Sequence, residues 1–182
     1  MSYLPQVDPQ QAPDATARQF RQIESAFGAL PNMFRTIGNS PAALESMWTS
    51  FGALGEGKLD AALGEKIAVL IADMNRCEYC LAAHTLMGQK AGASEAEMSE
   101  AQAGRAADPR TKAALTFAAK LVEARAHVSA EDVEAVRNAG FDDGEIAEIL
   151  AHVALNIFTN YTNVAFAVPL DFPAVSFVSA RS

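Results

Sequence analysis

Both cysteines of this chain lie in one short stretch, together with one of its three histidines. Cys80 follows Cys77 after two intervening residues, and His84 lies four positions beyond Cys80. On a helix, with about 100° per residue, these three side chains fall within about 60° of one another and share a face. Two thiols that can close a disulfide, with an imidazole one turn away, are the minimum equipment for thiol redox chemistry.

Three interpretations of Cys77, Cys80 and His84 compete. They could be buried as small core residues, but the shared face and the adjacent histidine count against that. A zinc site would need a fourth ligand from His127 or His152, and structural zinc sites more often bring two pairs of ligands together. A redox dithiol needs no further ligand. We therefore favour the dithiol and expect the purified protein to hold no stoichiometric metal.

The two cysteines differ in what would stabilise their thiolates. Cys77 is nearer to the positive end of the predicted helix, which contributes at most about 2 kcal/mol. Cys80 has His84 one turn away, and a well-paired imidazolium lowers the pKa of a cysteine by several units. The sequence therefore predicts that Cys80 is the sulfur that attacks an oxidant.

The sequence around these residues has helical periodicity, and the pattern of the whole chain predicts an all-α protein. Residues 61–74 form an apolar segment with helical periodicity, and Glu65 lies on it among small apolar residues. Taken alone, Glu65 is explained as a first-turn acid that faces the helix dipole. The chain has no useful strand-like alternation, no internal repeat and no Gly-rich phosphate loop. We expect an antiparallel bundle of about eight helices.

Start signals divide the rest of the chain. Residues 1–13 contain three prolines and predict an extended arm, after which Asp14 is the expected N-cap of a helix that reaches about Phe27. Ser40 and Asp108 are expected N-caps that come directly before a proline. Ser94 and Asp142 are each expected to open a helix with a capping box, and Ser129 is expected to cap a short helix.

The last predicted helix, about residues 143–168, is apolar but carries a polar stripe. The stripe recurs every three or four residues and consists of Glu145, Glu148, His152, Asn156, Asn160 and Asn163. A lipid-facing span would not carry such a stripe, so we expect a long soluble helix with two different faces. The stripe could line a subunit interface, face solvent or border the active site, and we rank the interface first and solvent second.

Composition sets broader bounds. The 182 residues are 50% hydrophobic, which suffices for one domain with a sizeable core, and the formal charge is −8. That charge disfavours nucleic acid and anionic membranes as partners. The first fourteen residues lack a basic residue and a long apolar run, so we expect no secretory signal and a cytoplasmic location in which the thiols rest reduced.

The spacing Glu65-x11-Cys77-x2-Cys80-x3-His84 resembles the core of the alkylhydroperoxidase D-like (AhpD-like) proteins in the carboxymuconolactone decarboxylase superfamily. Three stretches are similar to its peroxidase-related enzyme subgroup. They are Arg76-Cys77-Glu78-Tyr79-Cys80-Leu81-Ala82-Ala83-His84-Thr85, then Pro31-Asn32-Met33-Phe34-Arg35 with Ser40-Pro41-Ala42, and finally Pro169-Leu170-Asp171-Phe172-Pro173. The resemblance implies a single AhpD-like domain over residues 1–182, with an arm at 1–13, N-terminal helices at 14–58, core helices at 59–168 and a tail at 169–182.

The same resemblance implies a peroxidase, an alkylhydroperoxidase or peroxiredoxin-type oxidoreductase with a redox-active disulfide. Cys80 would attack a hydroperoxide and Cys77 would resolve the product, while Glu65 feeds a proton relay through His84. A dithiol or lipoyl-type reductant would reset the pair, no cofactor would be needed, and the protein would be a homo-oligomer, either a trimer or a hexamer. One residue departs from the pattern, because well-studied AhpD proteins carry histidine where this chain has Tyr79.

Two other functional classes stay open. The protein could be a thiol redox sensor or interaction module with little turnover. A carboxymuconolactone decarboxylase-like enzyme is the weaker alternative, because the decarboxylases share the fold implied here but typically lack the cysteine pair.

Overall fold

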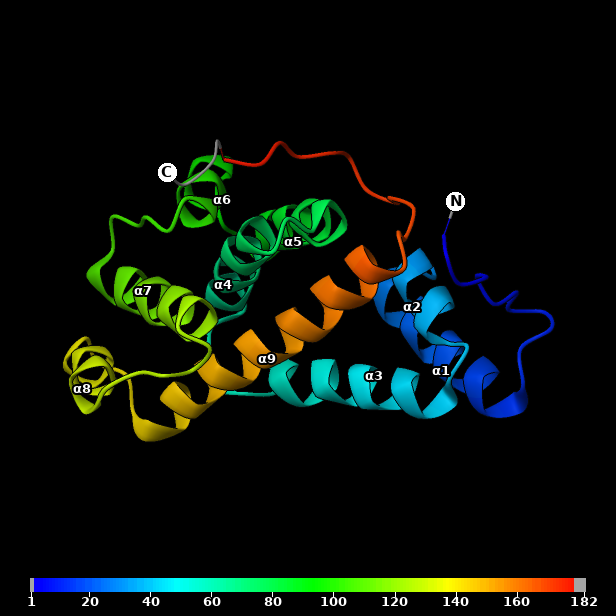
Figure 1. Ribbon diagram of the computed structural model, residues 1–182, viewed down its shortest axis with the longest axis horizontal. Coiled ribbons are helices and arrows are strands. Elements are labelled where there is room, and N and C mark those ends of the chain that lie inside the picture. Colours follow the sequence, from blue (N-terminus) through cyan, green and yellow to red (C-terminus); the bar gives the residue numbers. More distant parts are fainter. Residues whose placement is uncertain (1, 179–182) are drawn as a thin grey trace.

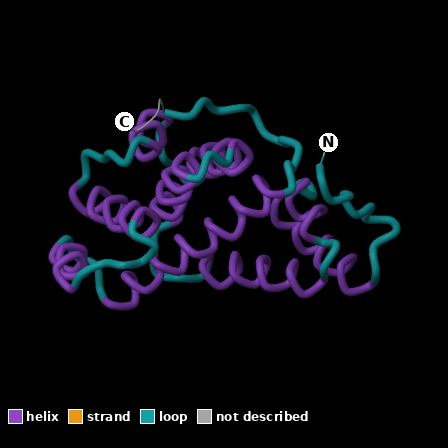
Figure 2. The backbone as a smooth tube through the Cα atoms, in the orientation of Figure 1, coloured by secondary structure: helices purple, strands orange, loops and turns teal. Residues whose placement is uncertain are grey.

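A computed structural model of the chain describes residues 2–178. Helices and loops make up all of this part, and no strand occurs within it (Figure 2). The expected all-α fold is confirmed, with nine helices in the described residues. They are α1 (Asp14–Phe27), α2 (Asn32–Ile37), α3 (Pro41–Gly55), α4 (Ala61–Met74), α5 (Glu78–Lys90), α6 (Glu95–Gln102), α7 (Pro109–Glu123), α8 (Ala130–Asn138) and α9 (Asp143–Ala165).

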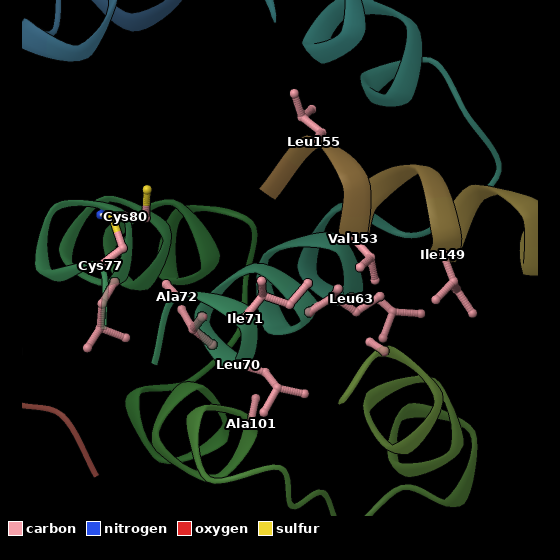
Figure 3. Close-up of a cluster of buried hydrophobic side chains, with 14 of the residues drawn as sticks. Leu63, Leu70, Ile71, Ala72, Cys77, Cys80, Ala101, Ile149, Val153 and Leu155 are labelled. Carbon is pink, nitrogen blue, oxygen red and sulfur yellow. Dashed lines mark hydrogen bonds between the residues drawn. The ribbon is translucent and has the colours of Figure 1, made fainter. Parts of the chain in front are cut away.

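Helix α4 is the centre of the bundle. It packs against α5, α6, α7 and α9, and α9 crosses the molecule diagonally between α4 and α3 (Figure 1). Ile67, Leu70 and Ile71 of α4 are completely buried. Figure 3 shows Leu63 of α4 beside Ile149 and Val153 of α9, and Leu70 of α4 beside Ala101 of α6. Burying an aliphatic side chain contributes about 1.5–3 kcal/mol, so this contact holds α4 and α9 firmly together.

The start signals in the sequence were correct with one exception. Ser40, Ser94, Asp108, Ser129 and Asp142 each accept a backbone hydrogen bond from the first turn of the helix that follows. Asp14, however, was wrongly expected to be an N-cap. It is the first helical residue of α1, and Pro13 holds the cap position without a side-chain bond. Proline has no side-chain acceptor, whereas an acid in the first turn still faces the helix dipole.

Helix α9 is three residues shorter than expected. It ends at Ala165, and Ala167 has a φ of 49°, in the left-handed region, so the helix cannot continue to residue 168. Within residues 2–178, none of the helices combines the length and the apolar character needed to cross a membrane.

The arm and the tail both lie on the bundle. In the arm, the Tyr3 amide donates to Phe166 O at 2.8 Å and the Val7 amide to Arg35 O at 3.0 Å. The tail follows α9 and runs over α5 toward α6 (Figure 1). There the Gln102 side chain donates to Ser176 O at 2.9 Å, and the Val178 amide donates to the Asp73 carboxylate at 2.9 Å.

Candidate functional site

The turn between α4 and α5 places the two cysteines at the start of a buried helix. Arg76 has a φ of 54°, and the amide of Cys77 bonds back to Ala72 O at 2.9 Å, which reverses the chain. Cys77 then occupies the N-cap position of α5, where its sulfur accepts a hydrogen bond from the Cys80 amide at 3.3 Å. Both cysteines are buried and free, with exposures of 1% and 2%. A thiol therefore does what a serine or aspartate usually does at a helix start.

Cys80 is surrounded by groups that stabilise a thiolate. Asn163 on α9 donates its side-chain amide to the Cys80 sulfur at 3.1 Å. Burial is the largest influence on the pKa of Cys80 and raises it, but the Cys77 thiol, the charge of His84 and the amides of Asn163 and Asn160 together outweigh burial and lower the pKa. The Cys80 sulfur is therefore the one that these neighbours favour as an anion.

Cys77 has the opposite environment. Its pKa is raised, first because its thiol hydrogen bonds to Cys80 and second because it is buried. With Cys77 protonated and Cys80 ionised, the pair has one nucleophilic thiolate and one neutral thiol. The roles of attacking and resolving cysteine remain predictions, and this asymmetry is consistent with them.

His84 and Glu65 form a buried pair across α4 and α5. His84 Nδ1 lies 2.7 Å from a Glu65 carboxylate oxygen, and the side chains are 8% and 23% exposed. Burial lowers the pKa of His84, but the charge and hydrogen bond of Glu65, together with the charge of Cys80, raise it above its ordinary value. The protonated form of His84 is therefore favoured by two neighbours, the Glu65 carboxylate and the Cys80 sulfur. The structure brings all four predicted site residues together.

An apolar pocket opens beside the Cys80 sulfur. This cysteine pocket has a cavity volume of about 30 Å³, and Cys80, His84, Phe51, Met33 and Phe172 are among its lining residues. Its other lining residues are Phe27, Pro31, Phe34, Tyr79, Ala83, Met87 and Thr159. Aromatic, methionine and alanine side chains dominate this wall, so the pocket suits an apolar or aromatic group presented to Cys80.

Tyr79 fastens the tail to the site. Its hydroxyl donates to the Asp171 carboxylate at 2.5 Å and accepts from the Met33 amide at 3.3 Å, while its ring packs edge-on against Phe172 at 5.4 Å between centroids. The Asn32 amide also donates to Asp171, at 2.6 Å. The three sequence stretches that carry the family resemblance therefore meet at one point. The Tyr79 hydroxyl forms its hydrogen bonds within this junction and not with the Glu65–His84 pair.

The ranking of the α9 stripe as an interface first was wrong for its three asparagines. Asn156, Asn160 and Asn163 are 4%, 0% and 4% exposed within the single chain, so they cannot face another subunit or solvent. Asn163 contacts Cys80, and Asn160 accepts a hydrogen bond from Asn75 at 2.9 Å while lowering the pKa of Cys80. The stripe is visible in the sequence, but Asn160 and Asn163 were not predicted to be site residues. Their only signal was the helical spacing of polar residues in an apolar helix.

One of the two candidate fourth ligands for zinc, His127, lies away from the cysteines. His127 lies between α7 and α8, where its Nδ1 is 3.0 Å from Ala124 O, whereas Cys77 and Cys80 lie at the start of α5. Within residues 2–178, no group of three or more histidine, cysteine, aspartate or glutamate side chains is arranged to hold a metal ion.

Comparison with known proteins agrees with this fold. The model of the carboxymuconolactone decarboxylase family matches residues 41–124, which contain all four predicted site residues. A peroxidase-related protein with an alkylhydroperoxidase AhpD core from Ralstonia eutropha JMP134 superposes with a TM-score of 0.86 at 25% identity, covering 93% of this chain and 92% of that one. A peroxidase-related protein from Silicibacter sp. TM1040 gives 0.80 at 27% identity, covering 91% and 88%.

The debrominase Bmp8, whose C82A variant was solved with 2,3,4-tribromopyrrole, has the same fold. It superposes with a TM-score of 0.78 at 22% identity, covering 93% of this chain and 91% of Bmp8. No curated protein matches the chain.

Proposed function

We propose that this chain is a thiol-dependent peroxidase that reduces hydroperoxides, and that it is related to the carboxymuconolactone decarboxylase and AhpD-like proteins. The match of residues 41–124 to the carboxymuconolactone decarboxylase family and the fold shared with an AhpD-core protein support the proposal. One observation carries the proposal. Cys80 is buried at the wall of an apolar pocket, its thiolate is stabilised by His84, and the protonated thiol of Cys77 bonds to it.

The first half of the reaction oxidises the pair. The Cys80 thiolate attacks the distal oxygen of a hydroperoxide, so that an S–O bond forms, the O–O bond breaks and an alkoxide leaves. His84 gives the alkoxide a proton, which yields an alcohol and a sulfenic acid on Cys80. Cys77 then attacks the sulfenic sulfur, and its proton leaves with the hydroxyl group as water while the disulfide closes.

The second half restores the thiols. An external dithiol, of the lipoyl or small-molecule type, reduces the disulfide by exchange and is itself oxidised to a disulfide. Cys80 returns as a thiolate, Cys77 returns as a thiol, and the remaining proton goes back to His84. Glu65 keeps the imidazole oriented through both halves and favours its protonated form before each turnover, because it accepts the hydrogen bond of Nδ1.

The decisive test is turnover. Purified protein should consume alkyl hydroperoxides when a dithiol is supplied, and Glu65→Gln should slow turnover by about tenfold or more because it removes the charge that holds His84 protonated. Oxidation of the pair by one equivalent of peroxide, without turnover under any dithiol, would instead identify a redox sensor.

A second candidate activity is reductive dehalogenation of an aromatic ring. Its support is the aromatic wall of the cysteine pocket, together with the shared fold of the debrominase Bmp8. In that reaction Cys80 would take the bromine from carbon, the carbon would gain a proton, and Cys77 would displace bromide as the disulfide forms. Bromide release from a brominated pyrrole, compared with peroxide consumption by the same preparation, separates the two activities.

We also propose that the protein forms a homo-oligomer, a trimer or a hexamer. The outer side of α9 exposes Leu150, Tyr161 and Val164, with exposures of 47%, 62% and 51%. Apolar residues at this spacing on one helix are typical of a helix–helix contact. Light scattering should give a multiple of the 19.3 kDa chain mass, and a constant monomer across micromolar concentrations would contradict the assembly.

A further inference from the structure

One part of the cysteine-pocket wall lies outside the helical bundle. Phe172 lines the pocket and belongs to residues 169–178, which form neither helix nor strand. We call this segment the strap; it runs from the end of α9 over α5 toward α6 (Figure 1). The pocket can therefore change shape at Phe172 without the unfolding of a helix.

The near end of the strap is fastened through Asp171. Its carboxylate accepts hydrogen bonds from the Tyr79 hydroxyl at 2.5 Å and from the Asn32 backbone amide at 2.6 Å, and the Asn32 side chain also donates to it. The next residue, Phe172, lies edge-on against the Tyr79 ring at 5.4 Å between centroids. Because Asp171 is exposed, water can replace these hydrogen bonds when the strap lifts.

The middle of the strap is loosely held. At the far end, Ser176 and Val178 are bonded to the bundle as described above. Between the two ends, residues 172–175 form no hydrogen bond with any other part of residues 2–178. Residues 173–176 also line a cavity of about 470 Å³ against α5 and α6. Closely packed side chains resist displacement, and this segment lacks such packing.

The closed cysteine pocket is too small for most hydroperoxides. Its cavity volume of about 30 Å³ holds about two water molecules, which is the size of hydrogen peroxide. Cys80 and His84 are 2% and 7% exposed, so a substrate reaches them only through this pocket. An alkyl or aromatic hydroperoxide must therefore displace part of the wall.

The other aromatic residues of the wall are less free to move. Phe34 is almost completely buried, and its ring contacts those of Phe27, Trp48 and Phe51 at 5.8, 5.9 and 6.0 Å between centroids. These rings come from α1, α2 and α3, so moving one of them disturbs three helices. Phe172 is held by the Asp171 anchor and one ring contact, and it is the part of the wall that yields most easily.

We propose that Phe172 is a gate over Cys80 and determines which hydroperoxides react, and that the bonds from Tyr79 and Asn32 to Asp171 hold this gate closed. This inference rests on the proposed function. With the gate closed, hydrogen peroxide fits beside the sulfur. A bulky hydroperoxide reacts only while the strap is lifted and Phe172 is out of the pocket.

The first experiment compares turnover of hydrogen peroxide and cumene hydroperoxide with a dithiol as reductant. Phe172→Ala should raise kcat/KM for cumene hydroperoxide by about tenfold relative to hydrogen peroxide, and Phe172→Leu should raise it less. Tyr79→Phe keeps the ring but loses the hydrogen bond to Asp171, so it should shift the same ratio upward by about threefold. General damage to the site would instead slow both substrates together.

The second experiment needs no peroxide. Cys80 in the reduced protein is alkylated with compact iodoacetamide or bulky N-phenylmaleimide at a pH above its pKa, and mass spectrometry locates the adduct. Phe172→Ala should speed the maleimide reaction by about tenfold and the iodoacetamide reaction less. Phe177→Ala is the matched control. It removes a ring that packs on Arg76 at 5.1 Å but leaves the Asp171 anchor intact, so both ratios should equal those of the wild type.

Unchanged ratios in Phe172→Ala, in turnover and in alkylation, would overturn the gate. Wild-type ratios in Tyr79→Phe would exclude Asp171 as its latch, and an equal change in Phe177→Ala would mean that any loosening of the strap opens the pocket. If the wild type consumed no hydroperoxide, the proposed function would fail, and the alkylation series would still decide whether Phe172 controls access to Cys80.

Discussion

The start of α5 and the start of α8 perform the same structural task with different atoms. At α8, Ser129 accepts from the Asp132 amide at 3.3 Å, and the Asp132 side chain accepts from the Ser129 amide at 2.7 Å. At α5, the cap is the sulfur of Cys77, and its thiol also hydrogen bonds to Cys80. Sulfur is a weaker acceptor than oxygen, and a lone thiol satisfies one amide where the capping box satisfies two.

The difference teaches which helix start serves stability and which serves chemistry. The α8 start is exposed and joined to α7 by an ion pair between Lys120 and Asp132, so it needs only a good cap. The α5 start is buried beneath α9 and the tail, and tertiary contacts hold it in place. A weaker cap is tolerated there, which leaves both sulfurs free to change oxidation state. Four predictions test this comparison.

Cys80→Ser should have the largest effect. Without the stabilised thiolate, peroxide consumption should fall below detection, and dimedone should label no sulfenic acid on the chain. Cys77 should stay unreactive, because burial still raises the pKa of its thiol after the Cys80 sulfur is gone. Dimedone adducts on Cys77 in this variant would mean that helix position outweighs imidazole pairing, and that the two roles are reversed.

Cys77→Ser should separate the two functions of the α5 cap. The variant should react with one equivalent of peroxide and then stop with Cys80 as a sulfenic acid, which mass spectrometry with dimedone detects. Serine is a better cap than cysteine, so the free energy of unfolding should be unchanged or higher by up to about 1 kcal/mol. Cys77→Ala is the matched variant and should lose stability instead. Continued multiple turnover by Cys77→Ser would exclude an intramolecular disulfide.

The pH dependence of Cys80 reactivity should show a smaller effect. Its pKa is lowered from 9.0 to about 6, so the thiolate forms as the pH rises through 6, and the rate of iodoacetamide alkylation should increase there and level off above it. His84→Ala removes the neighbouring cation and should move the midpoint upward by about one unit or more. His127→Ala should leave it unchanged. A midpoint near 9 in the wild type would contradict the proposed stabilisation of the thiolate.

Ser129→Ala should have the smallest effect on function. Loss of the α8 cap should cost about 1 kcal/mol in the free energy of unfolding, or roughly 2–4 °C in Tm for a chain of this size. Peroxide turnover should not change, because α8 does not contact the cysteine site. A large loss of activity in this variant would mean that the α7–α8 region supports the site in a way that its contacts do not indicate.

Local chemistry in the sequence determined much of this protein. Capping residues act on amides three positions away, and the spacing of Cys77, Cys80 and His84 is a property of one helix, so helix starts and the shared face followed from the chain alone. The resemblance around Glu65 correctly picked out a carboxylate that lies next to His84. The interpretation of Glu65 as a first-turn acid would have missed that contact, because it depends on how α4 packs against α5.

Only the tertiary structure decided which side of α9 faces the sulfur. Asn160 and Asn163 lie 80 or more positions beyond Cys80. Helical spacing alone does not distinguish a stripe that faces solvent from one at an interface or at a site. The packing of α9 across α4 buries both amides, so that Asn163 donates to the Cys80 sulfur and Asn160 accepts from Asn75 beside it. The same packing set His152 against Gly64 and tied Tyr79 to Asp171 across 92 residues. Such contacts arise from the bundle as a whole, because no segment of the chain contains both partners.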